Sequence, residues 1–147
     1  IIGLASVFAW AGSTLGAFDA IARQLATLHA ESWVILLLVN GLLLVAGMFL
    51  DAVSVYLILL PLLEPLARHL GWDLVWFGVV MTLTLAIGQA TPPMAINLMV
   101  TARIAGVSIE STIRWVLWPI AALLVALLLV MAFPELSLWL PRHLGYL

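Results

Sequence analysis

The sequence predicts an all-α membrane protein that combines transmembrane helices with one discontinuous helix and one re-entrant helical hairpin. Of its 147 residues, 66% are hydrophobic and only 8% are charged, a composition typical of chains that lie in a bilayer. The run 74–102 contains no Asp, Glu, Lys or Arg and is interrupted by Pro92-Pro93. Because proline lacks a backbone N–H and keeps the preceding residue out of the helical region, we expect two short helices, residues 74–87 and 94–102.

Neither of these two helices is long enough to cross the hydrocarbon core of a bilayer. At about 1.5 Å per residue they measure roughly 21 and 14 Å, against about 30 Å for the core. We therefore expect residues 72–105 to form a re-entrant hairpin whose tip lies at membrane depth. Irregular backbone at that depth is tolerated only where protein buries it or where it lines a wet cavity, so the tip is expected to be a binding site.

Composition and spacing argue against several other kinds of site. The formal net charge of -2 offers no basic surface for nucleic acid, and a chain without cysteine has neither disulfides nor thiolate ligands. The three histidines, His29, His69 and His143, are not paired at helical spacing, so we expect no transition-metal site. No G-x-S-x-G nucleophile motif occurs. We expect a protein that is not an enzyme and has no organic cofactor.

The first thirty residues predict two different helices. Residues 1–13 are apolar but amount to only half a span, and we interpret them as the end of a transmembrane helix. Residues 14–30 are amphipathic, with Asp19 and Arg23 at the i, i+4 spacing that supports an exposed helix. This pattern favours an interfacial linker helix, and a short helix with no role beyond connection is an equal alternative.

Residues 32–63 predict a broken helix that begins near Glu31 and Ser32. The run is too long for one untilted span, and Gly47-Met48-Phe49-Leu50-Asp51 predicts the interruption. Glycine weakens a helix by about 1 kcal/mol relative to alanine, and a carboxylate at the centre of a transmembrane helix costs roughly 2.5 to 3.5 kcal/mol. Asp51 is therefore expected to face a cavity, a partner or an opened helix end, unless it marks an ordinary helix boundary near the interface.

The remaining polar and aromatic positions predict how the elements are joined. A polar loop is expected to end the broken helix, through Pro61, Glu64, Pro65, Arg68, His69 and Gly71. Three aromatic residues at the mouth of the hairpin are expected to act as interfacial anchors: Trp72, Trp76 and Phe77. Ser108, with Glu110 in the first turn, is expected to cap a final transmembrane helix over residues 109–133, and Pro134, Trp139 and Pro141 follow it at an interface.

The expected breaks offer backbone groups of both polarities. The end of one half-helix presents free carbonyls, and the start of the next presents free N–H groups. Discontinuous membrane helices use this combination to bind a coupling ion beside an anionic substrate. Here the first half-helix ends at Gly88, Thr91 adds a hydroxyl, Met94 opens the second half-helix, and Asn97 lies one turn further on. A helix that is merely kinked by Pro-Pro, without an ion site, is the alternative.

The second break sharpens this expectation. Gly47 lies in the interrupted helix 32–63 and can supply a further carbonyl from across a narrow gap. A proton relay would require several intramembrane acids or histidines, and Asp51 is the one strong candidate in the sequence. The pattern therefore favours an alkali cation held by carbonyls over a proton.

Several motifs of this sequence occur together in a known family. They are Gly47-Met48-Phe49-Leu50-Asp51, the pair Pro61 and Pro65, Phe77-Gly78, Gly88-x-x-Thr91-Pro92-Pro93-x-x-x-Asn97-Leu98, Pro119, and Phe133-Pro134. With these motifs the sequence resembles the large membrane subunit of the tripartite ATP-independent periplasmic (TRAP) transporters, the DctM-like family. The resemblance covers essentially the whole sequence and corresponds to the C-terminal third of that subunit.

The resemblance implies a sodium-coupled secondary transporter that imports organic acids by an elevator mechanism across the bacterial inner membrane. The chain would be half of an inverted-repeat transporter, and without the first half it is not expected to transport alone. The implied partners are a small DctQ-like membrane subunit and a periplasmic DctP-like solute-binding protein. A structural membrane-anchoring module without an ion site is the alternative function.

The resemblance also assigns roles to individual residues. The positions that match the family's sodium site, formed largely by backbone carbonyls, are Gly47, Gly88, Thr91 and Met94. The positions expected near the substrate are Asp51, Pro92, Pro93 and Asn97. The sequence departs from the family at Ala95, where glycine is common, and the additional methyl group is expected to narrow the tip.

Overall fold

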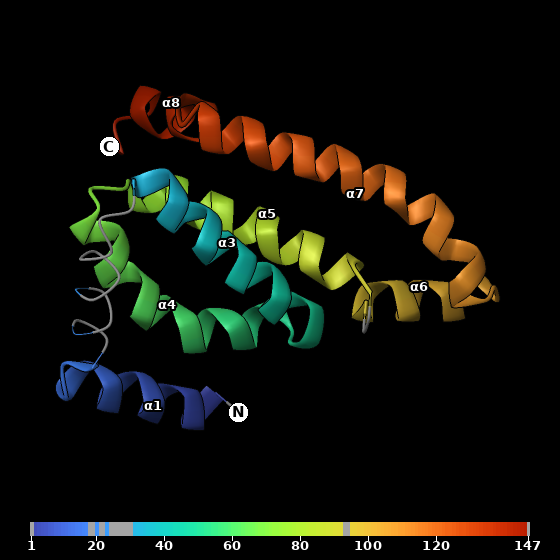
Figure 1. Cartoon of the computed structure of the whole chain (residues 1–147), viewed down its shortest axis with the longest axis horizontal. Coiled ribbons are helices and arrows are strands. Elements are labelled where there is room, and N and C mark those ends of the chain that lie inside the picture. Colours follow the sequence, from blue (N-terminus) through green and yellow to red (C-terminus); the bar gives the residue numbers. More distant parts are fainter. Residues whose placement is uncertain (1, 18–19, 21–22, 24–30, 93–94, 147) are drawn as a thin grey trace.

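The computed structural model describes residues 2–17, 20, 23, 31–92 and 95–146, and this part of the chain contains helices and no strand (Figure 1). In chain order the helices are α1 (Ile2–Thr14), α3 (Ser32–Phe49), α4 (Ala52–His69), α5 (Leu74–Ala90), α6 (Ile96–Ala105), α7 (Ile109–Ala132) and α8 (Glu135–His143). By length and composition α3, α4 and α7 can each cross a membrane. The prediction of an all-α membrane protein is confirmed at this level.

Helices α3 and α5 pack against each other in parallel, so that both end on the same side (Figure 1). Three contacts follow one another in the same order along the two segments: Ser32 with Trp72, Asn40 with Thr84, and Gly47 with Gly88. The first two are hydrogen bonds between side chains, and the third is an approach of backbones. The C-terminal ends of α3 and α5 therefore lie together.

The helix predicted over residues 32–63 is interrupted where the sequence indicated. Leu50 and Asp51 are extended, and Asp51 caps α4 by accepting hydrogen bonds from the Ser54 backbone N–H at 3.0 Å and the Ser54 hydroxyl at 2.5 Å. The chain turns back at this point, and α4 runs antiparallel to α3 and α5 (Figure 1). The first interruption thus produces a helical hairpin.

The segment predicted as a hairpin, residues 72–105, contains the two expected helices but has a different geometry. Helix α6 lies beyond the end of α5 and points away from it (Figure 1), so the structure does not confirm a hairpin here. The sides of α5 are occupied by α3, α4 and α7. Packing therefore leaves no place for α6 alongside α5. Along the long axis of the molecule, this break lies at nearly the same level as the α3–α4 turn (Figure 1).

The predicted polar loop at the end of α4 is wrong. Pro61 and Pro65 both lie inside α4, which continues to His69. A proline inside an isolated helix costs about 3 kcal/mol, but in a packed membrane helix neighbouring groups compensate for the lost hydrogen bond. The last turns are also linked by an ion pair between Arg68 and Glu64, at 2.8 Å.

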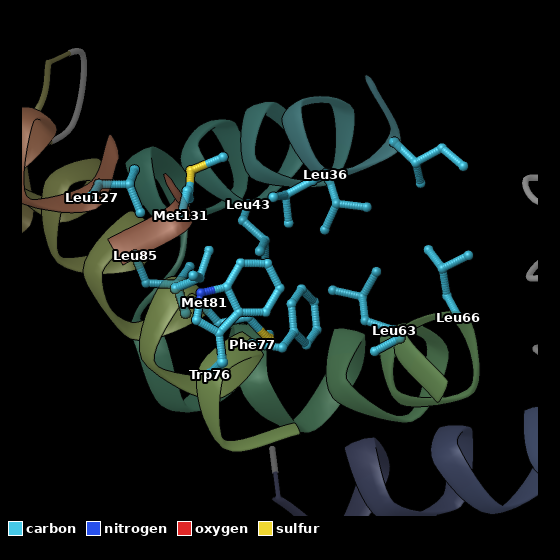
Figure 2. Packing of buried hydrophobic residues seen from close by; sticks show 14 of the residues in the cluster. Leu36, Leu43, Leu63, Leu66, Trp76, Phe77, Met81, Leu85, Leu127 and Met131 are labelled. Atoms are coloured by element: carbon cyan, nitrogen blue, oxygen red, sulfur yellow. The ribbon is translucent and has the colours of Figure 1, made fainter. Parts of the chain in front are cut away.

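The predicted interfacial role of Trp76 and Phe77 is also wrong, because both side chains are in the core. Figure 2 shows them among leucine and methionine side chains of α3, α4, α5 and α7. The indole N–H of Trp76 donates to the carbonyl of Val130 at 2.7 Å. In a regular helix this carbonyl would accept the N–H of residue 134, but Pro134 has none. Trp76 therefore satisfies a carbonyl that Pro134 leaves without its usual donor.

The remaining helices frame this core. Helix α1 packs on α4, and most of the linker predicted over residues 14–30 lies outside the described residues. Ser108 caps α7 as predicted, since its hydroxyl oxygen accepts the N–H of Ser111 at 3.3 Å. The short helix α8 was not predicted. An acidic first turn and a basic last turn, with Glu135 and Arg142, are the signals that would have indicated it.

Candidate functional site

The ends of α3 and α5 approach each other so closely that side chains are excluded between them. Gly47 and Gly88 are both buried. A Cβ atom on Gly88 would lie 2.8 Å from the Leu44 carbonyl oxygen and 3.0 Å from the Gly47 Cα, distances that real Cβ atoms rarely have. A Cβ atom on Gly47 would lie 3.3 Å from the Leu85 carbonyl oxygen. Glycine at these two positions therefore allows the two helix ends to meet.

Backbone carbonyls without hydrogen bonds gather at this meeting point. Among the described residues, no donor reaches the carbonyls of Gly47, Met48 and Phe49 at the end of α3, or those of Gln89 and Ala90 at the end of α5. The two preceding carbonyls of α5, at positions 87 and 88, are satisfied by residue 91 through its hydroxyl at 2.6 Å and its N–H at 3.0 Å. The site therefore offers oxygen acceptors in excess of donors.

The electrostatics of this arrangement favour a cation. The C-terminal end of a helix carries a partial charge of about -0.5, and two such ends lie side by side here because α3 and α5 are parallel. The carboxylate of Asp51 follows directly after the first of them. The arginines of α4, α6 and α8 lie in the last turns of those helices and not at this point. A positive charge between the ends would reduce their repulsion.

The opposite side of the break has the opposite polarity. Helix α6 starts at Ile96, and Ala95 before it provides no side-chain cap, so that N–H groups of the first turn of α6 are left without described acceptors. Ala95 is 3% exposed and has a φ of 43°, the left-handed conformation that favours glycine. This conformation is the physical reason why glycine suits the position.

A side-chain hydrogen bond crosses the same break. The Asn97 amide on α6 donates to the Gln89 side-chain oxygen on α5 at 2.9 Å. Sequence reasoning singled out Asn97 but missed Gln89. An amide directly after Gly88, in a run without charges, is the signal that would have drawn attention to it.

The structure brings together some of the predicted site residues and separates others. Gly47 and Gly88 are in contact, and the hydroxyl of Thr91 faces back to the end of α5. Asp51 is exposed and lies at an opened helix end, one of the settings expected for it, with its carboxylate engaged by Ser54. Of the other four, Pro92 and Asn97 are exposed, while Pro93 and Met94 lie outside the described residues.

Comparison with known proteins links this chain to one family. The family model for the DctM component of tripartite ATP-independent periplasmic transporters matches residues 1–136. The C4-dicarboxylate TRAP transporter large permease protein DctM of Pseudomonas aeruginosa is 39% identical over 99% of this chain and 34% of its own length. The sialic acid TRAP transporter large permease protein SiaM of Vibrio cholerae is 37% identical over 96% of this chain and 33% of its own length.

A further relative is the isethionate TRAP transporter permease protein DctMQ of Oleidesulfovibrio alaskensis. It is 40% identical over 77% of this chain and 18% of its own length. The chain spans about a third of the length of the DctM and SiaM relatives.

Proposed function

Since the chain belongs to the DctM family of TRAP transporter permeases, which are transporters and not enzymes, we propose that it forms the cation-binding part of a sodium-coupled importer of organic acids. The relatives are named for C4-dicarboxylates, sialic acid and isethionate, all of them organic acids. The proposal includes the family's tripartite assembly, with a small membrane subunit and a periplasmic solute-binding protein, in the bacterial inner membrane.

One observation carries the sodium proposal: the parallel ends of α3 and α5 meet at Gly47 and Gly88, and carbonyls beside this contact, including that of Gly47, have no hydrogen-bond donor among the described residues. Backbone carbonyls at helix ends are the ligands that transporters use for sodium at the middle of the bilayer. The ligands proposed here are the carbonyl of Gly47, the carbonyl of Gly88 through the lone pair that the Thr91 N–H does not use, and the oxygen of Thr91, together with Met94. Asp51 is engaged as a helix cap, which disfavours a proton as the coupling ion.

The substrate is proposed to bind next to this cation, on the side of α6. The N–H groups that begin α6 attract a carboxylate, and the Gln89–Asn97 amide pair supplies further hydrogen-bonding groups beside them. Asp51, Pro92 and Pro93 would border the same space. A bound cation would lower the cost of bringing a substrate anion to the ends of α3 and α5, and this is the physical basis of coupling.

The arrangement of the breaks supports a carrier in which the two interrupted segments have the opposite roles to those expected from the sequence. We assign the re-entrant hairpin to α3–α4 and the discontinuous helix to α5–α6. Their interruptions lie at nearly the same level along the long axis (Figure 1), as expected for a site at membrane depth in half of an inverted-repeat carrier. In an elevator mechanism α3 to α6 would move as one body with the bound cation and substrate.

The test is sodium-dependent uptake by the full-length permease, reconstituted in proteoliposomes with its small subunit and binding protein. A sodium gradient should drive uptake of the organic acid and an equal potassium gradient should not. The Thr91→Val variant should raise the sodium concentration for half-maximal uptake by about three- to tenfold, since it removes one oxygen. Uptake that does not depend on sodium would overturn the sodium coupling, and an unchanged sodium dependence of Thr91→Val would contradict the role of Thr91 as a ligand.

A further inference from the structure

Two buried polar side chains face each other in the apolar contact between α3 and α5. Asn40 is 7% exposed and Thr84 is fully buried, and among the residues whose burial the structure describes they are the only buried polar ones. Asn40 lies about two helical turns before Gly47, and Thr84 lies one turn before Gly88. The pair is therefore on the same faces of the two helices as the glycine contact and directly precedes it.

The hydrogen bonds of the pair have a defined direction. The Asn40 amide nitrogen donates to the carbonyl of Leu36 at 2.8 Å, and a carbonyl cannot donate. The amide oxygen of Asn40 must therefore face Thr84, whose hydroxyl lies 2.5 Å from it and 2.8 Å from the carbonyl of Val80. Both side chains have partners, and the single hydroxyl proton of Thr84 is shared between the Asn40 oxygen on α3 and the Val80 carbonyl on α5.

The glycine contact only weakly determines the relative height of the two helices, that is, the position of α3 along the axis of α5. Surfaces without Cβ atoms have few projections that interlock, so the contact of Gly47 with Gly88 by itself opposes sliding of α3 along α5 only weakly. A directional hydrogen bond one or two turns away prevents such sliding, because its geometry changes with height. Which carbonyls of the two ends stand opposite each other depends on this height.

We propose that Asn40 and Thr84 are positioning residues that fix the height of α3 against α5 and thereby set the spacing of the carbonyls that hold sodium. This inference rests on the proposed sodium site and adds residues that do not contact the ion. The ligands can bind a small cation tightly only when the two rows of carbonyls are held at the right separation. Loss of the link should weaken sodium binding without removing a ligand.

The chain contains a matched control in the same helix. The hydroxyls of Tyr56 and Thr82 also lie 2.5 Å apart, and this pair links α4 to α5. Thr82 lies two residues from Thr84 but is exposed, and α4 contributes no C-terminal end to the site. Tyr56→Phe therefore removes an interhelical hydrogen bond of the same length that does not set the α3–α5 contact.

The first experiment compares variants of the full-length permease in the reconstituted uptake assay, at equal amounts of folded protein. Thr84→Val keeps the volume and removes the hydroxyl, so we expect the sodium concentration for half-maximal uptake to rise about three- to tenfold with little change in maximal rate. We expect Thr84→Ser and Tyr56→Phe to match the wild type. Equal effects of Thr84→Val and Tyr56→Phe, or a loss of protein with unchanged sodium dependence, would overturn the inference.

A second experiment does not depend on sodium transport. Spin labels at positions 45 and 86, both exposed near the ends of α3 and α5, report the relative position of the two ends. Thr84→Val should shift or broaden their distance distribution, and Tyr56→Phe should not. An unchanged distribution would overturn the positioning role. If the distance distribution shifts but uptake by the permease does not depend on sodium, the positioning role is retained and only the proposed function is rejected.

Discussion

The chain interrupts its helices at two neighbouring places, by different means and with different results. Between α3 and α4 two extended residues, Leu50 and Asp51, reverse the direction of the chain. The carboxylate of Asp51 accepts hydrogen bonds from Ser54 and so caps the start of α4. Between α5 and α6 there are five residues, 91–95, and the helix resumes onward after the left-handed Ala95 (Figure 1). After the break with two prolines the chain continues in its original direction, and after the break without proline it turns back.

The comparison shows that the position at which a helix ends and the direction of the helix that follows have different causes. Proline determines that a helix stops, because it removes a donor and restricts the residue before it. The direction of the following helix depends on where an apolar surface is available for it. Helix α4 finds such a surface on α5, whereas α6 does not, because α5 is already covered. At both breaks, however, the C-terminal end of a helix lies at the glycine contact.

The largest expected effect concerns the direction of the two segments. Cysteines at Leu70 and Ala105 should be labelled by impermeant reagents from opposite sides of the membrane, because α5 and α6 together cross it. Cysteines at Ser32 and Leu70 should be labelled from the same side, because α3 and α4 form a hairpin. Labelling of positions 70 and 105 from one side would restore the hairpin over residues 72–105 and refute the assignment made here.

The next effect concerns the contact that the two breaks share. Gly88→Ala places a methyl group 2.8 Å from a carbonyl oxygen and should reduce sodium-driven uptake by about tenfold or more, with a destabilisation of about 1–3 kcal/mol. Gly47→Ala, with its nearest contact at 3.3 Å, should have a smaller effect. Gly41→Ala in α3 is the control, since nothing lies within 4 Å of its Cβ position. Equal losses at positions 41 and 88 would show that close approach is not the cause.

A moderate effect is expected at the cap of α4. Asp51→Ala should lower the free energy of unfolding, because it removes the acceptor for the Ser54 N–H. Asp51→Asn keeps an acceptor and should retain most of the stability. Thermal unfolding of the purified permease measures both. If Asp51→Asn abolishes uptake while stability is unchanged, the charge of Asp51 acts on the ion or substrate and the capping role is incomplete.

The smallest effect is expected at Ala95. Ala95→Gly relieves a left-handed conformation that costs roughly 1–2 kcal/mol, but it also loses one buried methyl group, worth about 0.8 kcal/mol, and makes the unfolded chain more flexible. The net change in the free energy of unfolding should be below about 1 kcal/mol. Ala95→Val should destabilise clearly more, because a β-branched residue tolerates this conformation poorly. Equal stabilities of the glycine and valine variants would contradict the left-handed geometry.

Local signals in the sequence were sufficient to locate the interruptions and the cap of α7, but not the Asp73 cap of α5. Pro92-Pro93 and the segment from Gly47 to Asp51 indicated the breaks, and Ser108 indicated the start of α7. The direction of α6 and the burial of Trp76 were not predictable in this way. In a chain that is apolar on nearly all faces, periodicity does not identify which helix covers which, so the choice between neighbours remains open.

The site shows the same division. Gly47 and Gly88 were identified as positions in separate breaks, and their contact follows from the parallel packing of α3 and α5. Gln89 and the Asn40–Thr84 pair were missed. Polar residues inside apolar helices have no fixed spacing to a partner in another helix, so the sequence gives no motif for them.

The hydrogen bond from the Trp76 indole to the Val130 carbonyl predicts that positions 76 and 134 vary together among homologues. A proline at 134 removes a backbone donor, and the indole at 76 replaces it. Each residue is therefore favourable mainly in the presence of the other. Homologues that have lost the proline can dispense with the tryptophan, and those that keep the proline should carry a donor side chain at the other position.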